Sequence, residues 1–363
     1  MGRLSSFGQH LYTGRVSFDF VGRRLLWYAI SAVLVLGSAA GLGVNGLERG
    51  IDFKGGVEFT AQVSDASSAS VDRLREAVID TGLDAASSPV VNTSGDSAIR
   101  VQTSALTQDE TSQVADALAS AGATEVSQNL VGPSWGAEVA KKAATGLVVF
   151  LVIVVLFIWA YFREWRMSVA AMVALAHDLV ITVGIYAWSG FEVTPATVTG
   201  LLTILGYSLY DTVVVFDKVR ENTRGITAST SRLYAEQANL AVNQTLVRSI
   251  NTSITALLPV GALLIVGVGV LGSGPLKDLA LALFVGMAVG TYSSIFIATP
   301  IAVQLKERDP AIREHTAKVL KRRAKELETA DAVAPVTARP VTTSAAAGRR
   351  QPQRSSRQQR RGR

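Results

Sequence analysis

Six long apolar segments constrain this sequence more than any other feature, because each is near the ~20 residues that a helix needs to cross a bilayer. They lie at residues 25–44, 143–162, 167–190, 193–216, 254–271 and 279–305. Hydrophobic residues make up 48% of the 363 positions and charged residues only 18%, a balance that no soluble core requires. Because there is no cysteine, a disulfide framework and thiolate metal ligation are excluded. The sequence therefore predicts a polytopic α-helical membrane protein with six transmembrane helices.

Basic residues flank the predicted spans on one side and set their orientation. Arginines precede the first span, Arg163 and Arg166 join the second to the third, and five Lys or Arg lie between the fourth and fifth. By the positive-inside rule these faces are cytoplasmic, which places both the N-terminal segment (residues 1–24) and the C-terminus inside. The first apolar run could instead be a cleaved signal peptide, but its length of about twenty residues favours an anchor.

The segment between the first two spans, residues 45–138, is acidic. It carries 5 Lys or Arg against 14 Asp or Glu, and it is predicted to lie outside the cytoplasm. Four parts of it have strand character, at residues 56–63, 90–93, 98–103 and 123–131. Residues 70–81 have a helical apolar spacing, and a capping box from Thr107 to Glu110 opens a second helix. The resulting βαββαβ order predicts an extracytoplasmic α+β domain of the ferredoxin-like type, a fold that serves many unrelated functions.

One carboxylate, Asp211, interrupts the otherwise uncharged stretch from residue 193 to residue 216. Insertion scales put a central Asp at roughly 2.5–3.5 kcal/mol, so such a residue usually faces a packed interior or a wet path and often serves ion movement. A carboxyl that stays protonated and hydrogen-bonded between helices is the structural alternative. Asp217 is turned about 240° from Asp211 around the helix, so the two cannot form a pair on one face. We interpret Asp217 first as a solvated ion-pairing residue and second as a relay member.

Three further ionisable residues are candidates for a proton relay with Asp211. Arg248 is the last charge before the uncharged residues 249–276 and is long enough to reach inward as a counter-charge, unless it is only a positive-inside flank. His177 and Asp178 come near the middle of the third span, where ionisable groups suggest a relay. The alternatives are a packing histidine and an aspartate that binds a neighbouring helix's polar backbone.

Small and rigid residues mark the places where the acidic domain joins the membrane helices. They are Gly55, Gly56, Gly132, Pro133 and Gly136. We predict that they act as hinges, with fixed turns as the alternative. Within the sixth span, Gly286 and Gly290 form a G-x-x-x-G pattern, which is typical of a close-packing seam.

Five motifs together resemble the SecF proteins of the SecD/SecF protein-export family, which belongs to the RND-like superfamily. They are GYSLYDTVVVFDKVREN from Gly206, DFKGGVEF from Asp52, VGPSWG from Val131, HD at His177 and RSINTS from Arg248. The resemblance covers residues from about 20 to 305. It ties the arginine of RSINTS to the intramembrane aspartate and includes Asp217 in its motif.

This resemblance implies a subunit of the bacterial plasma membrane that joins SecD beside the SecYEG channel, with a YajC-like subunit as a further candidate partner. Such a subunit uses the proton motive force to help pull a translocating preprotein out of the membrane at a late step. Two alternatives stay open: half of an RND-type exporter of lipid or small molecules, and a passive translocon scaffold. No enzyme is predicted, because the sequence offers no nucleophile–base pair, metal cluster or phosphate loop, and no cofactor is expected.

The C-terminal segment, residues 306–363, is basic, with 16 Lys or Arg against 6 Asp or Glu. From residue 329 onward its composition cannot bury a core, so we predict a largely disordered cytoplasmic tail. Attraction to anionic lipid or to ribosomal RNA is the alternative. Since the rest of the chain offers no nucleic-acid module, no specific nucleic-acid partner is predicted.

Overall fold

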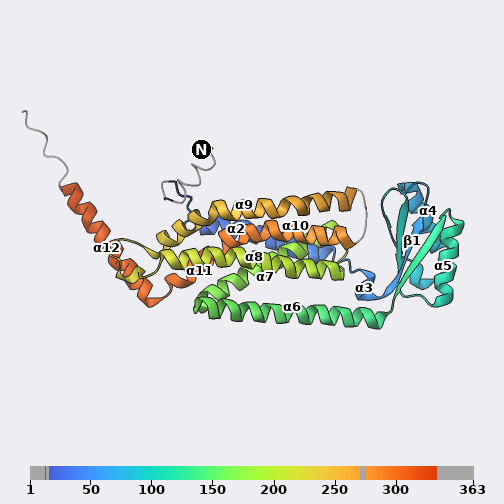
Figure 1. Ribbon diagram of the computed structural model, residues 1–363, viewed down its shortest axis with the longest axis horizontal. Coiled ribbons are helices and arrows are strands. Elements are labelled where there is room, and N and C mark those ends of the chain that lie inside the picture. Colours follow the sequence, from blue (N-terminus) through green and yellow to red (C-terminus); the bar gives the residue numbers. More distant parts are fainter. Residues whose placement is uncertain (1–12, 14–15, 270–274, 333–363) are drawn as a thin grey trace, which may run out of the picture.

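The computed structural model describes residues 13, 16–269 and 275–332. The predictions for most of the N-terminal segment and for the tail beyond residue 332 lie outside the described residues. The chain forms an elongated body with a helical bundle in its middle, a small sheet domain at one end and helix α12 (Pro310–Ala332) at the other (Figure 1).

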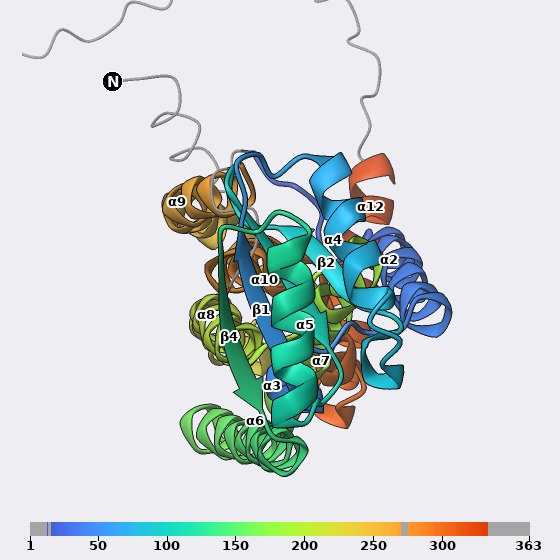
Figure 2. The ribbon, with the colours of Figure 1, turned by 90° about the vertical axis from the view of Figure 1, so that its right-hand side faces the viewer.

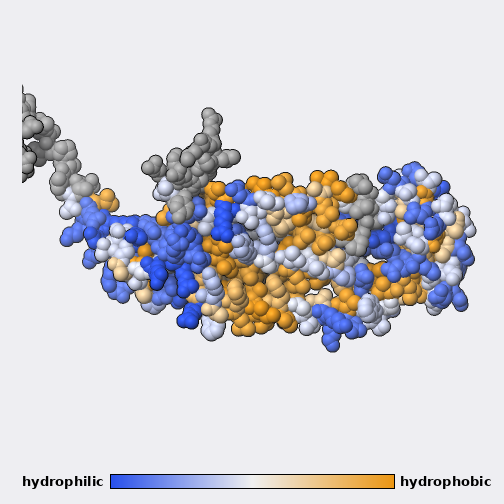
Figure 3. Space-filling model, in the orientation of Figure 1, coloured by the Kyte–Doolittle hydropathy of each residue, from blue (hydrophilic) through white to orange (hydrophobic). Residues whose placement is uncertain are grey.

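Six helical segments in the described part are long and apolar enough to cross a membrane, as predicted. They are α2 (Arg24–Val44), α6 (Pro133–Phe162), α7 (Trp165–Ser189), α8 (Pro195–Asn222), α9 (Tyr234–Gly269) and a composite of α10 (Pro275–Ser293), the π-helix Ser294–Ala298 and α11 (Thr299–Glu307). On the face seen in Figure 3, apolar surface covers the middle of the bundle, and the two ends of the molecule are mainly hydrophilic. This distribution is the one that a bilayer-spanning bundle requires.

Two helices extend well beyond their apolar windows. Helix α6 begins at Pro133 rather than at residue 143, and α9 begins at Tyr234 rather than at residue 254. The early part of α9 is held by the chain before α2, because Asn239 and Asn243 accept hydrogen bonds from the backbone amides of Phe20 and Phe18, both at 2.8 Å. Polar side chains thus continue a helix where hydropathy alone ends it.

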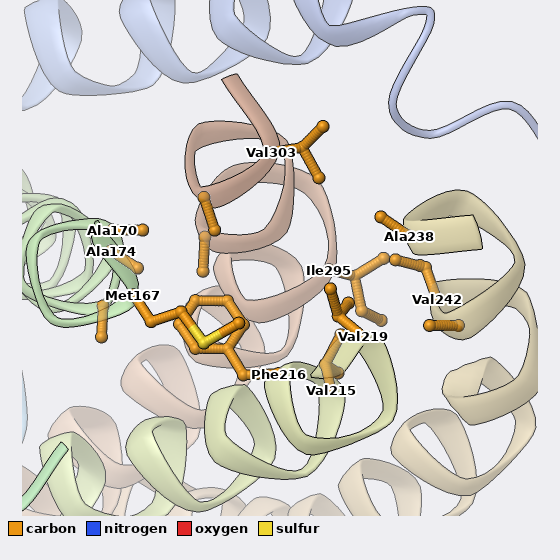
Figure 4. Close-up of a cluster of buried hydrophobic side chains, with 14 of the residues drawn as sticks. Met167, Ala170, Ala174, Val215, Phe216, Val219, Ala238, Val242, Ile295 and Val303 are labelled. Atoms are coloured by element: carbon orange, nitrogen blue, oxygen red, sulfur yellow. The ribbon is translucent and has the colours of Figure 1, made fainter. Parts of the chain in front are cut away.

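The bundle core is built mainly on α7, α8 and the last span. Figure 4 shows Met167 of α7, Phe216 of α8 and Ile295 of the π-helix among apolar side chains that point toward one another. At the predicted seam, a Cβ atom at Gly286 would lie 1.8 Å from the Ile204 side chain, so α10 touches α8 at this glycine. This close approach fixes α8 against α10, the two helices that carry much of the site described below.

The sheet domain contains four strands in the order β2-β3-β1-β4, with every neighbouring pair antiparallel. The strands are β1 (Gly56–Gln62), β2 (Val90–Thr93), β3 (Ala98–Thr103) and β4 (Glu125–Val131), and the helices are α4 (Ser68–Ile79) and α5 (Gln108–Ser120). The capping box predicted at Thr107 and Glu110 starts α5. Helices α4 and α5 cover the face of the sheet that is turned away from the bundle (Figure 2).

The two faces of the sheet differ in polarity. Val57, Phe59 and Ala61 of β1 are fully buried beneath α4 and α5. The intervening side chains of the sheet turn toward the bundle, where Arg100 and Gln102 of β3 contact Glu192 in the turn between α7 and α8. The domain therefore docks on the bundle through its polar face.

Candidate functional site

Asp211 lies on α8 in the interior of the bundle and is 9% exposed. Two serine hydroxyls donate to its carboxylate: Ser249 of α9 to Oδ1 at 2.6 Å and Ser294 of the π-helix to Oδ2 at 2.5 Å. Hydrogen bonds from a hydroxyl to a carboxylate at such short distances are among the stronger ones in proteins. Asp211 is therefore held between three helical elements by neutral donors.

Asp178 of α7 forms a second buried carboxylate site and is 1% exposed. Its Oδ2 accepts hydrogen bonds from Ser208 of α8 at 2.6 Å and from Ser293 of α10 at 2.8 Å. Its Oδ1 lies 3.1 Å from Nδ1 of the neighbouring His177. His177 and Asp178, the predicted pair in the third span, are thus buried, and both oxygens of the Asp178 carboxylate have partners.

The two carboxylate sites are connected through shared elements. Ser208 and Asp211 are separated by three residues on α8, so they lie on the same side of that helix. Ser293 ends α10 and Ser294 begins the π-helix, and these consecutive hydroxyls serve Asp178 and Asp211 respectively. The π-helix thus begins at the point where the two carboxylate sites are connected. Because π-helical turns occur often at functional sites, this position supports a functional role for the connection.

The second ring nitrogen of His177 is buried and without a partner among the described residues. Its ring stacks on Tyr292, with ring centroids 6.1 Å apart and planes inclined by 27°. The Tyr292 hydroxyl in turn donates to the Trp27 carbonyl of α2 at 3.1 Å. An imidazole that bonds a carboxylate through one nitrogen and keeps the other free can accept and pass on a proton.

Arg248 does not take the position that we predicted. Helices α8 and α9 are neighbours, but the exposed Arg248 donates to the Tyr210 hydroxyl at 2.9 Å, and within the described part of the chain it forms no ion pair with Asp211. The next residue, Ser249, reaches Asp211 instead. Because consecutive helical residues diverge by about 100°, the two side chains cannot face Asp211 together.

Asp217 lies on the predicted other face of α8 and is exposed. It lines a cavity of about 690 Å³ at the α12 end of the bundle, together with Arg220, Arg224 and Lys306. The structure therefore separates Asp217 from the two buried carboxylates and places it in a cavity lined by both basic and acidic side chains, the latter including Glu164 and Glu221.

The five predicted hinge residues gather where the sheet domain meets α6. Gly55 and Gly56 have φ values of 76° and 151°, and a Cβ at Gly55 would lie 2.6 Å from the Pro133 Cα. A Cβ at Gly136 would lie 3.0 Å from the Phe53 carbonyl, whereas one at Gly132 would meet nothing within 4 Å. The backbones are thus in direct contact at four of the five positions, and only Gly132 has space around it.

Sequence reasoning missed the hydroxyl donors at Ser208, Ser249, Ser293 and Ser294. Within the RSINTS motif, Ser253 also bonds Thr291 of α10 at 2.6 Å, whereas Thr252 donates to its own helix at the Arg248 carbonyl. The available signal was the pair of adjacent serines after Gly290 in an apolar span. In the described ranges no three His, Asp or Glu side chains are grouped in a way that could hold a metal ion.

Comparisons with known proteins agree over most of the chain. The family model for the C-terminal part of protein export membrane proteins SecD/SecF matches residues 112–308, and the model for the SecD/SecF GG motif matches residues 40–66. A protein translocase subunit SecF from Streptomyces coelicolor is 49% identical over 89% of this chain and 86% of its own length. The corresponding subunit from Mycobacterium tuberculosis is 45% identical, over 88% of this chain and 74% of its own.

Two solved structures share the fold. The crystal structure of SecDF from Thermus thermophilus, described as a translocon-associated membrane protein, matches 81% of this chain with a TM-score of 0.70 and 34% identity. SecDF in a super-membrane-facing form matches 86% with a TM-score of 0.56 and 29% identity. The matched parts are 39% and 40% of those chains, so this chain spans about two fifths of the length of SecDF.

Proposed function

This chain belongs to the SecD/SecF family of protein export membrane proteins, and we propose that, as a SecF-type subunit of the protein translocase, it uses the proton motive force to assist late steps of export. The observation that carries the proposal is the pair of buried carboxylates, Asp178 and Asp211, joined through serine hydroxyls. A passive scaffold has no need of two ionisable groups in the apolar part of a bundle, where each is costly.

The chemistry follows from what each group can hold. Asp211 binds a proton as a neutral acid, and the Ser249 and Ser294 hydroxyls, which can donate or accept, rotate to match either protonation state. His177 and Asp178 form an adjacent acceptor pair that can exchange a proton with this site through Ser208 and Ser293. These seven side chains come from α7, α8, α9 and the last span.

In this proposal Arg248 is not a permanent partner of Asp211 but pairs with it only in a second state of the bundle. A rotation of α9 by about 100° would replace Ser249 by Arg248 at Asp211, since the two are consecutive on the helix. The guanidinium would favour the carboxylate and drive the proton out. Asp217, at the cavity at the α12 end of the bundle, is then the first acidic group beyond the relay on the cytoplasmic side.

Orientation and partners complete the proposal. The positive-inside distribution supports cytoplasmic termini in a bacterial plasma membrane, with the sheet domain outside as a ferredoxin-like unit between the first two spans. The matched SecDF chains join a SecD part and a SecF part under one name, which supports SecD as the partner. The SecYEG channel, the translocating preprotein and a YajC-like subunit are the further partners that we propose.

The test compares Asp211→Asn with the wild-type chain in inverted membrane vesicles that carry the whole translocase. We expect normal abundance and normal ATP-driven initiation but no stimulation of export by the proton motive force, because Asn keeps the size of the side chain and abolishes ionisation. Asp116→Asn, an exposed carboxyl on α5, is the matched control and should behave as wild type. Undiminished stimulation in Asp211→Asn vesicles would remove the relay from the mechanism.

A further inference from the structure

A third buried carboxylate lies at the sheet end of the bundle, away from the relay. Asp278, in the first turn of α10, is 2% exposed, and its buried Oδ2 atom has no hydrogen-bond partner among the described residues. A buried carboxylate oxygen without a donor is costly, and it is normally satisfied by a proton, by water or by an ion. The Oδ2 atom of Asp278 can therefore bind a proton, a water molecule or an ion.

Asp278 lines a cavity of about 220 Å³ between the sheet domain and the bundle. The cavity also presents Arg100, Glu192, Asn92 and Lys277, and it has room for several water molecules. The Lys277 Nζ atom lies over the Phe191 ring, 4.4 Å from its centre. The carboxyl is thus buried from bulk solvent but lies beside a polar, hydratable space.

Charges around the cavity favour an arriving cation. Arg100 is already engaged by two carboxylates, Glu58 at 3.5 Å and Glu192 at 3.4 Å. Asp52 lies close enough that Glu192 adds to the effect of burial in raising the pKa of Asp52, while Arg100 opposes both. Glu192 and Asp278 line the cavity together with Arg100 and Lys277. Outside this lining, Glu58 pairs with Arg100, and Asp52 interacts with both Glu192 and Arg100, so both add negative charge to the surroundings.

A row of buried polar side chains on α7 leads from this cavity to the relay. Asp178, Thr182 and Tyr186 are spaced by four residues and are 1%, 0% and 2% exposed, so they share one buried side of the helix. The Tyr186 hydroxyl donates to the backbone carbonyl of Asp278, and the Thr182 hydroxyl donates to that of Asp178 at 2.7 Å. The row covers about 12 Å at 1.5 Å per residue.

We propose that Asp278 is the outer proton acceptor of this subunit and supplies the relay at Asp178 along the polar side of α7. The inference rests on the proposed function and on the outward orientation of the sheet domain. A hydronium ion in the cavity transfers its proton to the Asp278 carboxylate and leaves as water. The neutral acid then gives the proton to a water or hydroxyl on the Tyr186 side and returns to the carboxylate, so that charge and atoms balance.

The test measures proton uptake into proteoliposomes that contain the whole chain with its SecD partner, loaded with a pH-sensitive dye and facing outward. At an outer pH of about 8, Asp278→Asn should lower the Asp211-dependent uptake about a hundredfold, the lower end of what a positioned proton acceptor contributes. The loss should be smaller at an outer pH of about 6, where protons reach Asp178 directly through cavity water. Asp278→Glu should restore uptake, and the exposed control Asp116→Asn should leave it unchanged.

The outcomes separate the two proposals. Wild-type uptake in Asp278→Asn at both pH values, with uptake still abolished by Asp211→Asn, would overturn the outer acceptor and leave the proposed function standing. Uptake that is insensitive to Asp211→Asn would overturn the proposed function itself. If Asp278→Asn instead abolished a sodium flux and left proton uptake intact, the acceptor would bind sodium and the proposal would be wrong. Infrared difference spectra give a readout independent of flux: we expect a carboxylic-acid band that titrates with outer pH and is missing in Asp278→Asn.

Discussion

Replacing Gly290 by Ala should disturb the relay without touching any of its ionisable groups. A Cβ atom at this position would lie 2.8 Å from the Ser208 Cβ and 3.1 Å from its hydroxyl oxygen. Carbon atoms prefer separations of about 3.5–4.0 Å, so α8 or the Ser208 side chain must retreat by about 1 Å. The 2.6 Å bond from Ser208 to Asp178 would then exceed hydrogen-bond distance.

The magnitude follows from two contributions. Overpacking of a close interface costs about 1–3 kcal/mol. Loss of a hydrogen bond to a charged group adds about 1.5–3 kcal/mol. We therefore expect Gly290→Ala to lower the melting temperature of the purified complex by several degrees. Export driven by the proton motive force should fall with it, because Asp178 loses one of its two hydroxyl donors from serine.

Matched variants decide whether this reasoning is right. A Cβ at Gly146 of α6 would meet nothing within 4 Å, so Gly146→Ala should be neutral or stabilise the helix by about 0.5–1 kcal/mol. Combining Gly290→Ser with Ser208→Gly restores both the space and a hydroxyl and should recover much of the loss, which a double-mutant cycle would report as coupling. If Gly290→Ala were as mild as Gly146→Ala, the seam would not hold Ser208 in place.

Three further predictions concern the ends of the molecule. Glu192→Gln should weaken the 3.4 Å ion pair with Arg100 and speed hydrogen exchange in β3, and unchanged exchange would show that the contact does not hold the domain. The pKa of Glu110 is held below its ordinary 4.5 by hydrogen bonds from the Thr107 amide and hydroxyl, so the stability that this box gives α5 is present above pH 4.5 and is lost as the pH falls through the lowered value. Exchange of the α5 amides should rise over that acid range in the wild type, with a weaker pH dependence in Thr107→Ala. Deleting residues 334–363 should leave export near normal, because that composition cannot fold; a defect as severe as that of Asp211→Asn would contradict this.

The spans were predictable because length and apolarity are local properties. The same is true of the strands: residues 90–93 and 98–103 form β2 and β3 with the predicted bounds. Helix ends were less predictable, because Asn239 and Asn243 in the early part of α9 bond the segment that precedes α2. Hydropathy predicts which residues lie in the membrane, but it does not predict contacts between segments that are distant in sequence.

The site was only partly predictable for a related reason. Sequence indicates that Asp211, Asp178 and His177 are unusual, because an ionisable group in an apolar span is rare. It does not give the rotation of α9 about its axis, and this rotation decides whether Arg248 or Ser249 faces Asp211. Serines carry little signal of their own, because small hydroxyl residues are common at helix contacts in membranes for packing alone.

The joint between the sheet domain and the bundle bears on how a relay could move the domain. Backbone contact at Gly55 and Gly136 leaves little room for rotation there, whereas Gly132 has open space around it. The turn between α7 and α8 is also tied to the chain that leads into β1, because Val193 donates to the Glu48 carbonyl at 2.7 Å and accepts from the Gly50 amide at 3.0 Å.

These ties connect the domain to the two helices that carry the buried carboxylates. A shift of α7 or α8 would be passed to the domain through the turn and through the contact of Glu192 with Arg100. Packed elements transmit small shifts as rigid displacements because they cannot deform continuously. We therefore expect the domain to move as one body with the α7–α8 turn and to pivot near Gly132. A cysteine pair that locks the domain to α6 should then block late export until it is reduced, and normal proton-dependent export from the fully crosslinked chain would restrict the coupling to motion within the bundle.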